Sequence, residues 1–129
     1  MRKLSLVALM SLSLIMAGCK ADAEAVLNDT IAKMNEMTAI LKTVTDQNSS
    51  KAAATKLKAV VEDLKEIKKR DDKIRISESE KKRLLDKHSK ELADMKAGLT
   101  TQMTRIMGTP GAMTPELAGV IDSMGALMK

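Results

Sequence analysis

The sequence contains no aromatic side chain at all: phenylalanine, tyrosine and tryptophan are each absent from its 129 residues. Sugar-binding clefts, base-stacking platforms and cation cages are built on aromatic faces. The sequence therefore excludes a carbohydrate cleft, and it gives no support to nucleic-acid binding. A buried core must be made from aliphatic side chains and from the 11 methionines, without the large burial area of an aromatic ring.

Groups that commonly perform catalysis are equally scarce. The chain has one histidine and one cysteine, and it has no glycine-rich phosphate loop. A single cysteine also excludes a disulfide within the chain. We therefore expect a non-enzymatic protein without a cofactor.

The amino terminus has the pattern of a secretory signal. Arg2 and Lys3 precede an uncharged run over residues 4–17. A helix that spans a bilayer needs roughly 20 apolar residues, so this run is too short. Its length and its cationic start are typical of a signal peptide that is cleaved.

The end of this segment resembles the lipobox of bacterial lipoproteins, usually Leu-Ala-Gly-Cys. The matching residues are Met16, Ala17, Gly18 and Cys19, with methionine in place of the usual leucine. The resemblance implies cleavage before Cys19 and acylation of that residue, so that 1–18 is the signal peptide and 19–129 the mature lipid-anchored domain. Two or more acyl chains anchor a protein stably. The alternative is a plain secretory signal with a chance cysteine.

Lys20 bears on the destination of the protein. In the lipoproteins that this segment resembles, an aspartate after the cysteine favours retention in the inner membrane, so Lys20 implies the outer membrane, facing the periplasm. The alternative is the outer face of the cytoplasmic membrane.

Loss of residues 1–18 removes two cations, which leaves 20 basic against 17 acidic residues and lowers the net charge from +5 to +3. Such a mild excess is not typical of a nucleic-acid-binding protein.

Apolar residues recur at steps of three and four along the mature chain, which is the period of an α-helix. The first two stripes are Leu27, Ile31, Met34, Met37, Leu41, Val44 and then Ala53, Leu57, Val60, Leu64, Ile67. Residues 45–50 form a predicted turn with Ser49 or Asn48 as the next helix cap.

The second half of the chain continues the helical pattern. Residues 68–75 end the second helix, and Ser77 with Glu80 has capping-box spacing. The third stripe is Leu85, His88, Leu92, Met95, Leu99, Met103 and Ile106, and it stops at residues 108–111. Thr114 and Pro115 then start a short helix with the apolar face Leu117, Ile121, Met124 and Met128.

No stretch alternates with the period of a strand, so we expect an all-α fold. Short connections favour antiparallel neighbours. The sequence predicts an antiparallel up-down-up bundle of three long helices plus a short C-terminal helix, with Leu64 and Leu92 in its core. An intertwined oligomeric coiled coil is the alternative.

Methionine pairs suggest one candidate metal site. Met34 with Met37 and Met103 with Met107 have helical spacing, as do Met124 and Met128, and thioethers select Cu(I). His88 with Glu91 one turn later could supply two further ligands. The alternative is that these methionines fill a core without aromatic side chains and that His88 is a boundary residue.

Cations are concentrated where the second helix meets the third. They are Lys65, Lys68, Lys69, Arg70, Lys73, Arg75, Lys81, Lys82 and Arg83. Because the second helix returns toward the anchored end, we expect this junction near the membrane, where each cation contributes about 1 kcal/mol of attraction to anionic head groups. The alternative is a solvated hairpin tip.

The mature chain also has two partial resemblances to known families. Lys129 is similar to the C-terminal lysine of murein lipoprotein, but that family's continuous helix is missing. "LTTQ" at residues 99–102 is one residue short of the Leu-Thr-x-x-Gln motif of the small periplasmic chaperones related to Spy, and the chain is not assigned to them.

The sequence favours a non-enzymatic binding or scaffolding role with an unknown envelope partner. Cu(I) handling and a Spy-like chaperone are the alternatives.

Overall fold

The computed structural model describes the backbone of residues 2–127 and the side chains of residues 21–127. Its elements are the helices α1 (Arg2–Lys42), α2 (Gln47–Asp72), α3 (Glu78–Lys87), α4 (Ser89–Met107) and α5 (Pro115–Leu127). Over residues 2–127 there is no strand, which confirms the all-α prediction. The predictions for the signal peptide, Cys19, Met128 and Lys129 concern side chains outside the described residues.

Three helix boundaries follow the sequence pattern closely. α4 ends at Met107, just before the predicted stop at residues 108–111. Ser77 caps α3, because its Oγ accepts a 3.2 Å hydrogen bond from the backbone N–H of Glu80. Thr114 caps α5 in the same way, accepting from the N–H of Leu117 at 3.3 Å, and Gly111 has the positive φ of 76° that the turn before it needs.

The cap of α2 differs from the prediction. Asp46, and not Ser49 or Asn48, is the N-cap: its Oδ1 accepts from the N–H of Ser49 at 2.8 Å, while the Oγ of Ser49 accepts from the N–H of Asp46 at 3.0 Å. This reciprocal pair starts the helix at Gln47, earlier than expected, because an aspartate satisfies the orphan N–H groups of the first turn. The backbone N–H of Ser49 and then its hydroxyl, which both donate to Oδ1 of Asp46 at 2.8 Å, lower the pKa of the Asp46 carboxyl.

The third long helix is bent, which the sequence did not indicate. His88 ends α3 and precedes α4 with φ −103° and ψ 15°. The bend turns the apolar face of α3, so that Leu84 is buried whereas Leu85, which the stripe had placed in the core, is 44% exposed. The single predicted helix is therefore two segments.

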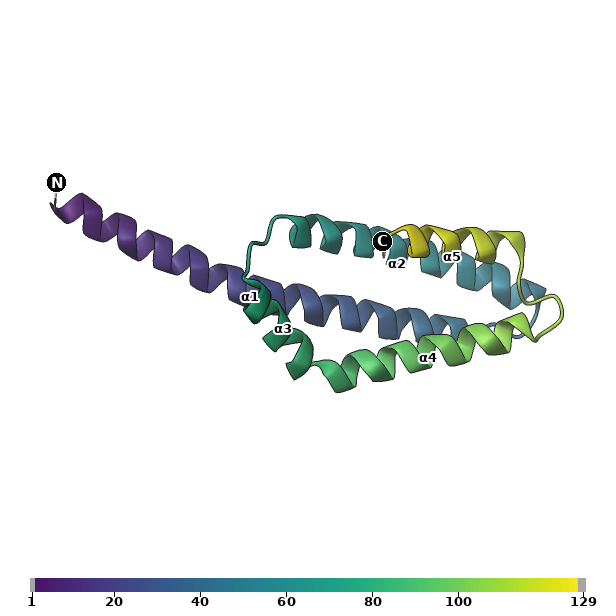
Figure 1. The fold of residues 1–129 in the computed structure, drawn as a ribbon. Helices are drawn as coiled ribbons and strands as arrows, with labels where there is room; N and C mark the ends of the chain where they lie inside the picture. Colours follow the sequence, from purple (N-terminus) through teal and green to yellow (C-terminus); the bar gives the residue numbers. More distant parts are fainter. Residues whose placement is uncertain (1, 128–129) are drawn as a thin grey trace.

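The helices form an open arrangement (Figure 1). α1 and α2 are antiparallel neighbours, α4 packs along α1, and α5 packs along α2. Within residues 21–127, α4 makes no extensive backbone contact with α2 or α5. The packing order is thus α4–α1–α2–α5, and space remains between its two outer members.

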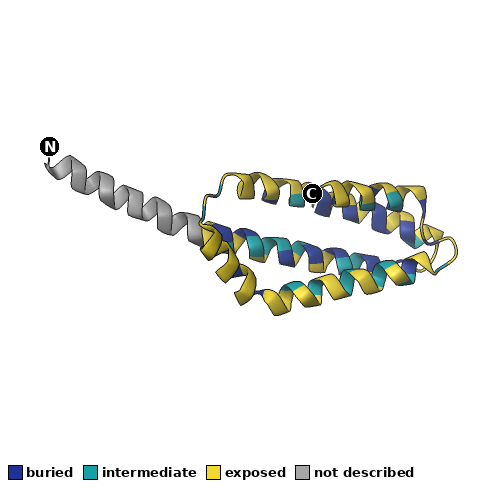
Figure 2. Ribbon diagram, viewed as in Figure 1, coloured by how far each residue is buried: buried dark blue, intermediate teal, exposed yellow. Residues whose placement is uncertain are grey.

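Burial is deepest where α1 turns into α2. Leu41, Leu57, Ile106 and Leu117 are fully buried there, and Figure 2 shows the buried residues on the inward faces of the helices. Leu64 is partly buried and packs against the core, whereas Leu92 is partly buried and is not part of it, so the prediction is wrong for Leu92. Their helices, α2 and α4, do not close on each other.

Candidate binding groove

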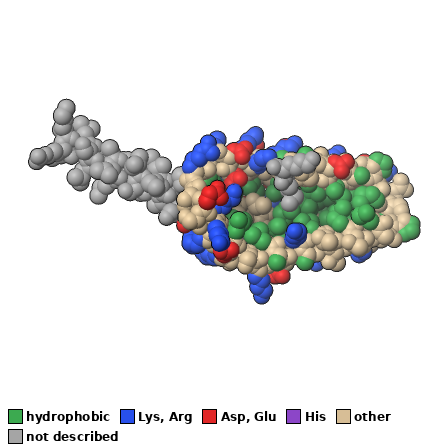
Figure 3. Space-filling model, viewed as in Figure 1, with side chains coloured by type: hydrophobic (Ala, Val, Ile, Leu, Met, Phe, Trp, Pro, Cys, Tyr) green, Lys and Arg blue, Asp and Glu red, His purple; other side chains and the backbone are tan. Residues whose placement is uncertain are grey.

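The space between the outer helices is an open groove with a volume of about 870 Å³. Ala23, Val26, Met34 and Met37 of α1 line it, and the other helices add Leu64, Leu84, Met95 and Leu127 among others. Figure 3 shows hydrophobic side chains gathered in this hollow, with charged side chains around one end. The volume lies within the range of small-molecule sites in proteins, roughly 300–1,000 Å³.

Four methionines from three helices line the groove. They are Met34 and Met37 of α1, Met95 of α4 and Met124 of α5. Met34, Met37 and Met124 are buried in the hydrophobic core, as the alternative interpretation of the methionines predicted, whereas Met95 is partly buried. Methionine is flexible and polarizable, so a wall of thioethers adapts to apolar ligands of different shapes. The spacing of single pairs could not reveal this set, since it joins residues that lie far apart in the sequence.

The other predicted methionine ligands lie elsewhere. Met103 is partly buried and packs against the core, whereas Met107 is 72% exposed. Neither lines the groove. The Cu(I) hypothesis stays a prediction. The methionines that lie close together in the structure are those that line the groove, and not the pair Met103 and Met107.

The apolar part of the groove offers almost no polar group. Thr30 is the one uncharged polar residue among the described residues that line it, and its hydroxyl donates to the carbonyl of Val26 in its own helix at 2.8 Å. The groove wall is therefore suited to a ligand that requires no hydrogen bonds along its length.

Charged residues surround the end of the groove at the α2–α3 junction. They comprise three cations and three carboxylates: Lys68, Arg75, Lys81, Asp71, Asp72 and Glu78. None of the six forms an ion pair with another residue of 21–127. We refer to these six residues as the charged mouth.

The predicted basic junction divides into paired and unpaired cations. Lys65 and Lys69 bind glutamates one turn away, Arg83 binds Glu80, and Arg70 reaches Asp29 of α1 at 2.9 Å. Within the described chain, the remaining five have no ion pair: Lys68, Lys73, Arg75, Lys81 and Lys82. The contact with Asp29 places the junction beside the early part of α1, ten residues after Cys19 in the sequence.

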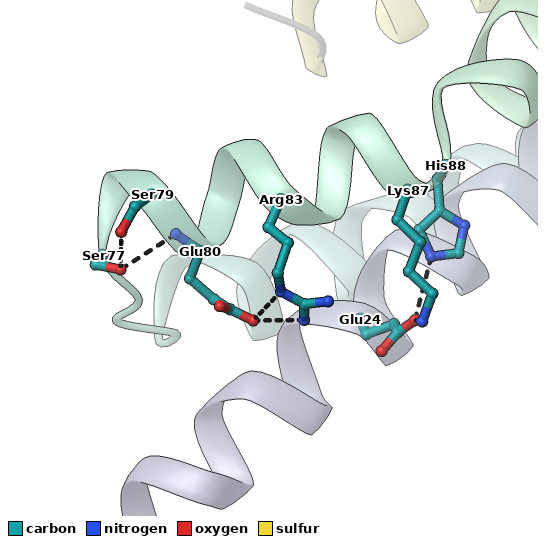
Figure 4. A network of polar contacts seen from close by, with 7 residues as sticks. All are labelled: Glu24, Ser77, Ser79, Glu80, Arg83, Lys87 and His88. Carbon is teal, nitrogen blue, oxygen red and sulfur yellow. Dashed lines mark hydrogen bonds and ion pairs between the residues drawn. The ribbon is translucent and has the colours of Figure 1, made fainter.

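A polar network fastens the bend between α3 and α4 to α1 (Figure 4). Glu24 accepts a 2.6 Å hydrogen bond from Nζ of Lys87 and lies 3.2 Å from Nε2 of His88, whose Nδ1 is 3.4 Å from Glu91. These contacts, chiefly that with Lys87, lower the pKa of the Glu24 carboxyl. His88 is only 7% exposed, so its ring fills the junction between the helices.

Among residues 21–127 no group of three or more histidine, cysteine, aspartate or glutamate side chains is arranged to hold a metal ion. The buried ring of His88 contacts Glu24 and Glu91 at the bend. These contacts agree with the alternative prediction that His88 is a boundary residue.

Comparison of the chain with known protein families, with curated proteins and with solved structures finds no match. Across the part of the chain that the structure describes, none of the helices combines the length and apolar character needed to cross a bilayer.

Proposed function

We propose that this protein is a non-enzymatic, lipid-anchored binding protein that holds an apolar ligand in its methionine-lined groove. In this proposal residues 1–18 are a cleaved signal peptide, and acylated Cys19 anchors the mature domain, residues 19–129, to the outer membrane on its periplasmic side. The mature domain is an antiparallel up-down-up bundle in which the short α5 lies against α2.

The observation that carries the proposal is the open groove itself. The groove of about 870 Å³ is open to solvent, and partly buried apolar side chains such as Leu64, Met95 and Leu127 line it. Each Å² of apolar ligand surface removed from water gains about 25 cal/mol. A ligand that buries about 300 Å² would gain roughly 7 kcal/mol before the cost of its immobilisation.

Binding is tested with the full chain and the dye 1-anilinonaphthalene-8-sulfonate, which fluoresces in apolar sites. Met95→Lys places a charge in the groove, and we expect it to weaken dye binding roughly tenfold, a loss of about 1.4 kcal/mol. Met107→Lys changes an exposed residue of the same helix outside the groove and is the matched control. Equal dye binding by both variants, with unchanged helical circular dichroism, would contradict the proposal.

The anchor is tested separately by intact mass. Cys19→Ala should abolish the acyl mass and leave the signal segment attached. A wild-type mature protein without acyl groups on Cys19 would exclude the lipoprotein assignment while leaving the groove proposal in place.

The five unpaired cations of the α2–α3 junction give the proposed orientation on the membrane. Attraction between them and anionic head groups would turn this end of the bundle toward the leaflet. The test is the binding of residues 20–129, which lack the signal segment and Cys19, to anionic vesicles at low salt. Lys73→Glu with Lys82→Glu should reduce it relative to the parent chain, and an unchanged affinity would argue against this orientation.

A second candidate, a periplasmic chaperone, is favoured by the same exposed apolar concavity. It differs in its ligand, which would be an unfolded protein. Suppression of client aggregation at a stoichiometric dose supports this candidate, whereas dye binding without suppression excludes it.

Cu(I) handling is tested by competition of the protein with a Cu(I) chelator, and a protein that does not compete would exclude Cu(I) handling.

A further inference from the structure

We propose that the ligand of the groove is a phospholipid, with its acyl chains among the methionines and its zwitterionic head group at the charged mouth. This inference rests on the proposed function, since it names the chemistry of the apolar ligand. Three properties of the groove carry it: its dimensions, the lack of free hydrogen-bond donors along its apolar wall, and the balance of charge at one end.

The dimensions match acyl chains. Along α1 the groove extends from Ala23 to Met37, a distance of about 21 Å at ~1.5 Å per residue. An acyl chain in one leaflet spans about 15 Å, half of the hydrocarbon core. A methylene group is about the size of a water molecule, ~30 Å³, so a volume of about 870 Å³ holds nearly thirty of them, which is close to two acyl chains.

The apolar wall disfavours an extended peptide. Every residue of such a peptide carries a backbone N–H and C=O, and each polar group buried without a partner is costly. The hydroxyl of Thr30 is already used within α1, so the wall offers no donor for these groups. An acyl chain has no such requirement.

An α-helical partner satisfies its own backbone but does not fit inside. A helix about 10 Å wide and about 21 Å long occupies roughly 1,600 Å³, nearly twice the volume of the groove. Such a helix could lay only one face into the opening, so acyl chains match the groove better.

The charged mouth matches a zwitterion. Lys68, Arg75 and Lys81 lie at the same end as three carboxylates, and none of these groups is paired with another residue of the described chain. A phosphate is recognised by the cations, while an ammonium group is recognised by the carboxylates. Phosphatidylethanolamine carries both charges within one head group.

The experiment uses the absence of tryptophan from the chain. The full chain with Met95→Trp carries its only fluorophore in the groove, and the full chain with Lys96→Trp carries it on the neighbouring exposed residue. Each is mixed with vesicles of phosphatidylethanolamine brominated on its acyl chains, since bromine quenches tryptophan at short range. We expect at least twofold stronger quenching of the Met95→Trp variant. Equal quenching of both variants means adsorption to the vesicle surface and overturns the inference.

The head group is tested in the Met95→Trp variant by changing the brominated lipid. Phosphatidylethanolamine should quench more strongly than brominated diacylglycerol, and the combined Lys68→Gln, Arg75→Gln and Lys81→Gln changes should remove that preference. Equal quenching by the two lipids, or a preference that the glutamines leave intact, overturns the assignment of the head group to the mouth.

The dye experiment separates the two proposals. Dye binding that depends on Met95, without quenching by brominated lipid, overturns the phospholipid inference and leaves the binding function standing. In that case a helical peptide or an unfolded protein becomes the ligand to test. Loss of both signals overturns both proposals.

Discussion

Arg105 illustrates how much one side chain contributes to this fold. Its guanidinium donates to the carbonyl of Leu41 at 2.8 Å and to that of Val44 at 2.7 Å, while Nε donates to Gln102. The last carbonyls of a helix have no partner within it, and they carry the negative end of the helix dipole. A cation from α4 therefore closes the end of α1 and joins the two helices.

Replacement of Arg105 should consequently destabilise the protein. For Arg105→Met we expect a loss of about 2 kcal/mol in the free energy of unfolding, the range for hydrogen bonds to a charged group. The measurement is urea denaturation followed by circular dichroism. Lys96→Met removes an exposed cation of the same helix and should cost much less; an equal cost would mean that loss of charge, and not of the cap, is responsible.

Glu24 makes the stability of the protein depend on pH in the acidic range. Its folded-state pKa lies below its ordinary value of 4.5, first because of the hydrogen bond from Lys87 and then that from His88. A lowered carboxyl pKa stabilises the folded state above the unfolded value, and that stabilisation is lost as the pH falls through the folded value.

The thermal midpoint should therefore fall as the pH is lowered below about 4.5, and it should fall less in Glu24→Gln than in the parent chain. Glu116→Gln is the control, because Glu116 is exposed and forms no ion pair among the described residues. Identical pH profiles for Glu24→Gln and the control would rule out this role for the network.

At the level of helices, one buried hydroxyl pair joins α5 to α2 in addition to their apolar packing. Oγ of Ser50 lies 2.9 Å from Oγ1 of Thr114, and both residues are almost fully buried. Thr114 also caps α5, so the same hydroxyl starts this helix and attaches it to the first turns of α2.

Ser50→Ala should leave the Thr114 hydroxyl without its partner from α2. The cost of an unsatisfied buried group is about 1–3 kcal/mol, measurable by urea denaturation. Ser123→Ala is the matched control, because Ser123 is exposed and bonds only to the carbonyl of Gly119 in its own helix. A Ser50→Ala variant as stable as the control would show that apolar packing alone holds α5.

Across the whole molecule, tight packing and open space lie at opposite ends. Leu57 and Leu41 are fully buried near the α1–α2 turn, whereas Leu64 and Met95, which line the groove, are partly buried. Local stability follows the density of buried contacts, so we expect the groove end to be the less stable part of the protein.

Leucine truncation should measure this difference. Leu57→Ala should cost about 2–5 kcal/mol, as for a fully buried leucine, and Leu64→Ala, in the partly buried wall of the groove, should cost less. Hydrogen exchange provides a second measurement, in which amides of residues 53–61 exchange more slowly than those of residues 84–95. Equal costs for the two substitutions would mean that the groove closes in solution.

The sequence predicted those parts of the structure that depend on neighbours along the chain. Helical periodicity and the caps at Ser77 and Thr114 are local, and both could be recognised directly. The bend at His88 and the cap by Arg105 could not, since each depends on a partner about 60 residues away, Glu24 and Leu41 respectively.

The groove was missed for a related reason. Period and spacing show that a helix has an apolar face, but not which other helix covers it. Leu64 and Leu92 have the same pattern as fully buried residues, and only the packing order α4–α1–α2–α5 separates them. The methionines could be recognised as unusual in number, but the set that lines one cavity required the tertiary structure.

The packing order also has a consequence for how the chain folds. α1 and α2 are joined by a short turn, so bringing them together closes only a small loop, whereas α4 must return to α1 and α5 to α2 across many residues. Loop closure costs more entropy as the loop lengthens, and nearby contacts form faster than distant ones. We expect the α1–α2 hairpin to form in the folding transition state and α4 and α5 to dock afterwards, so that the groove is the last feature of the molecule to appear.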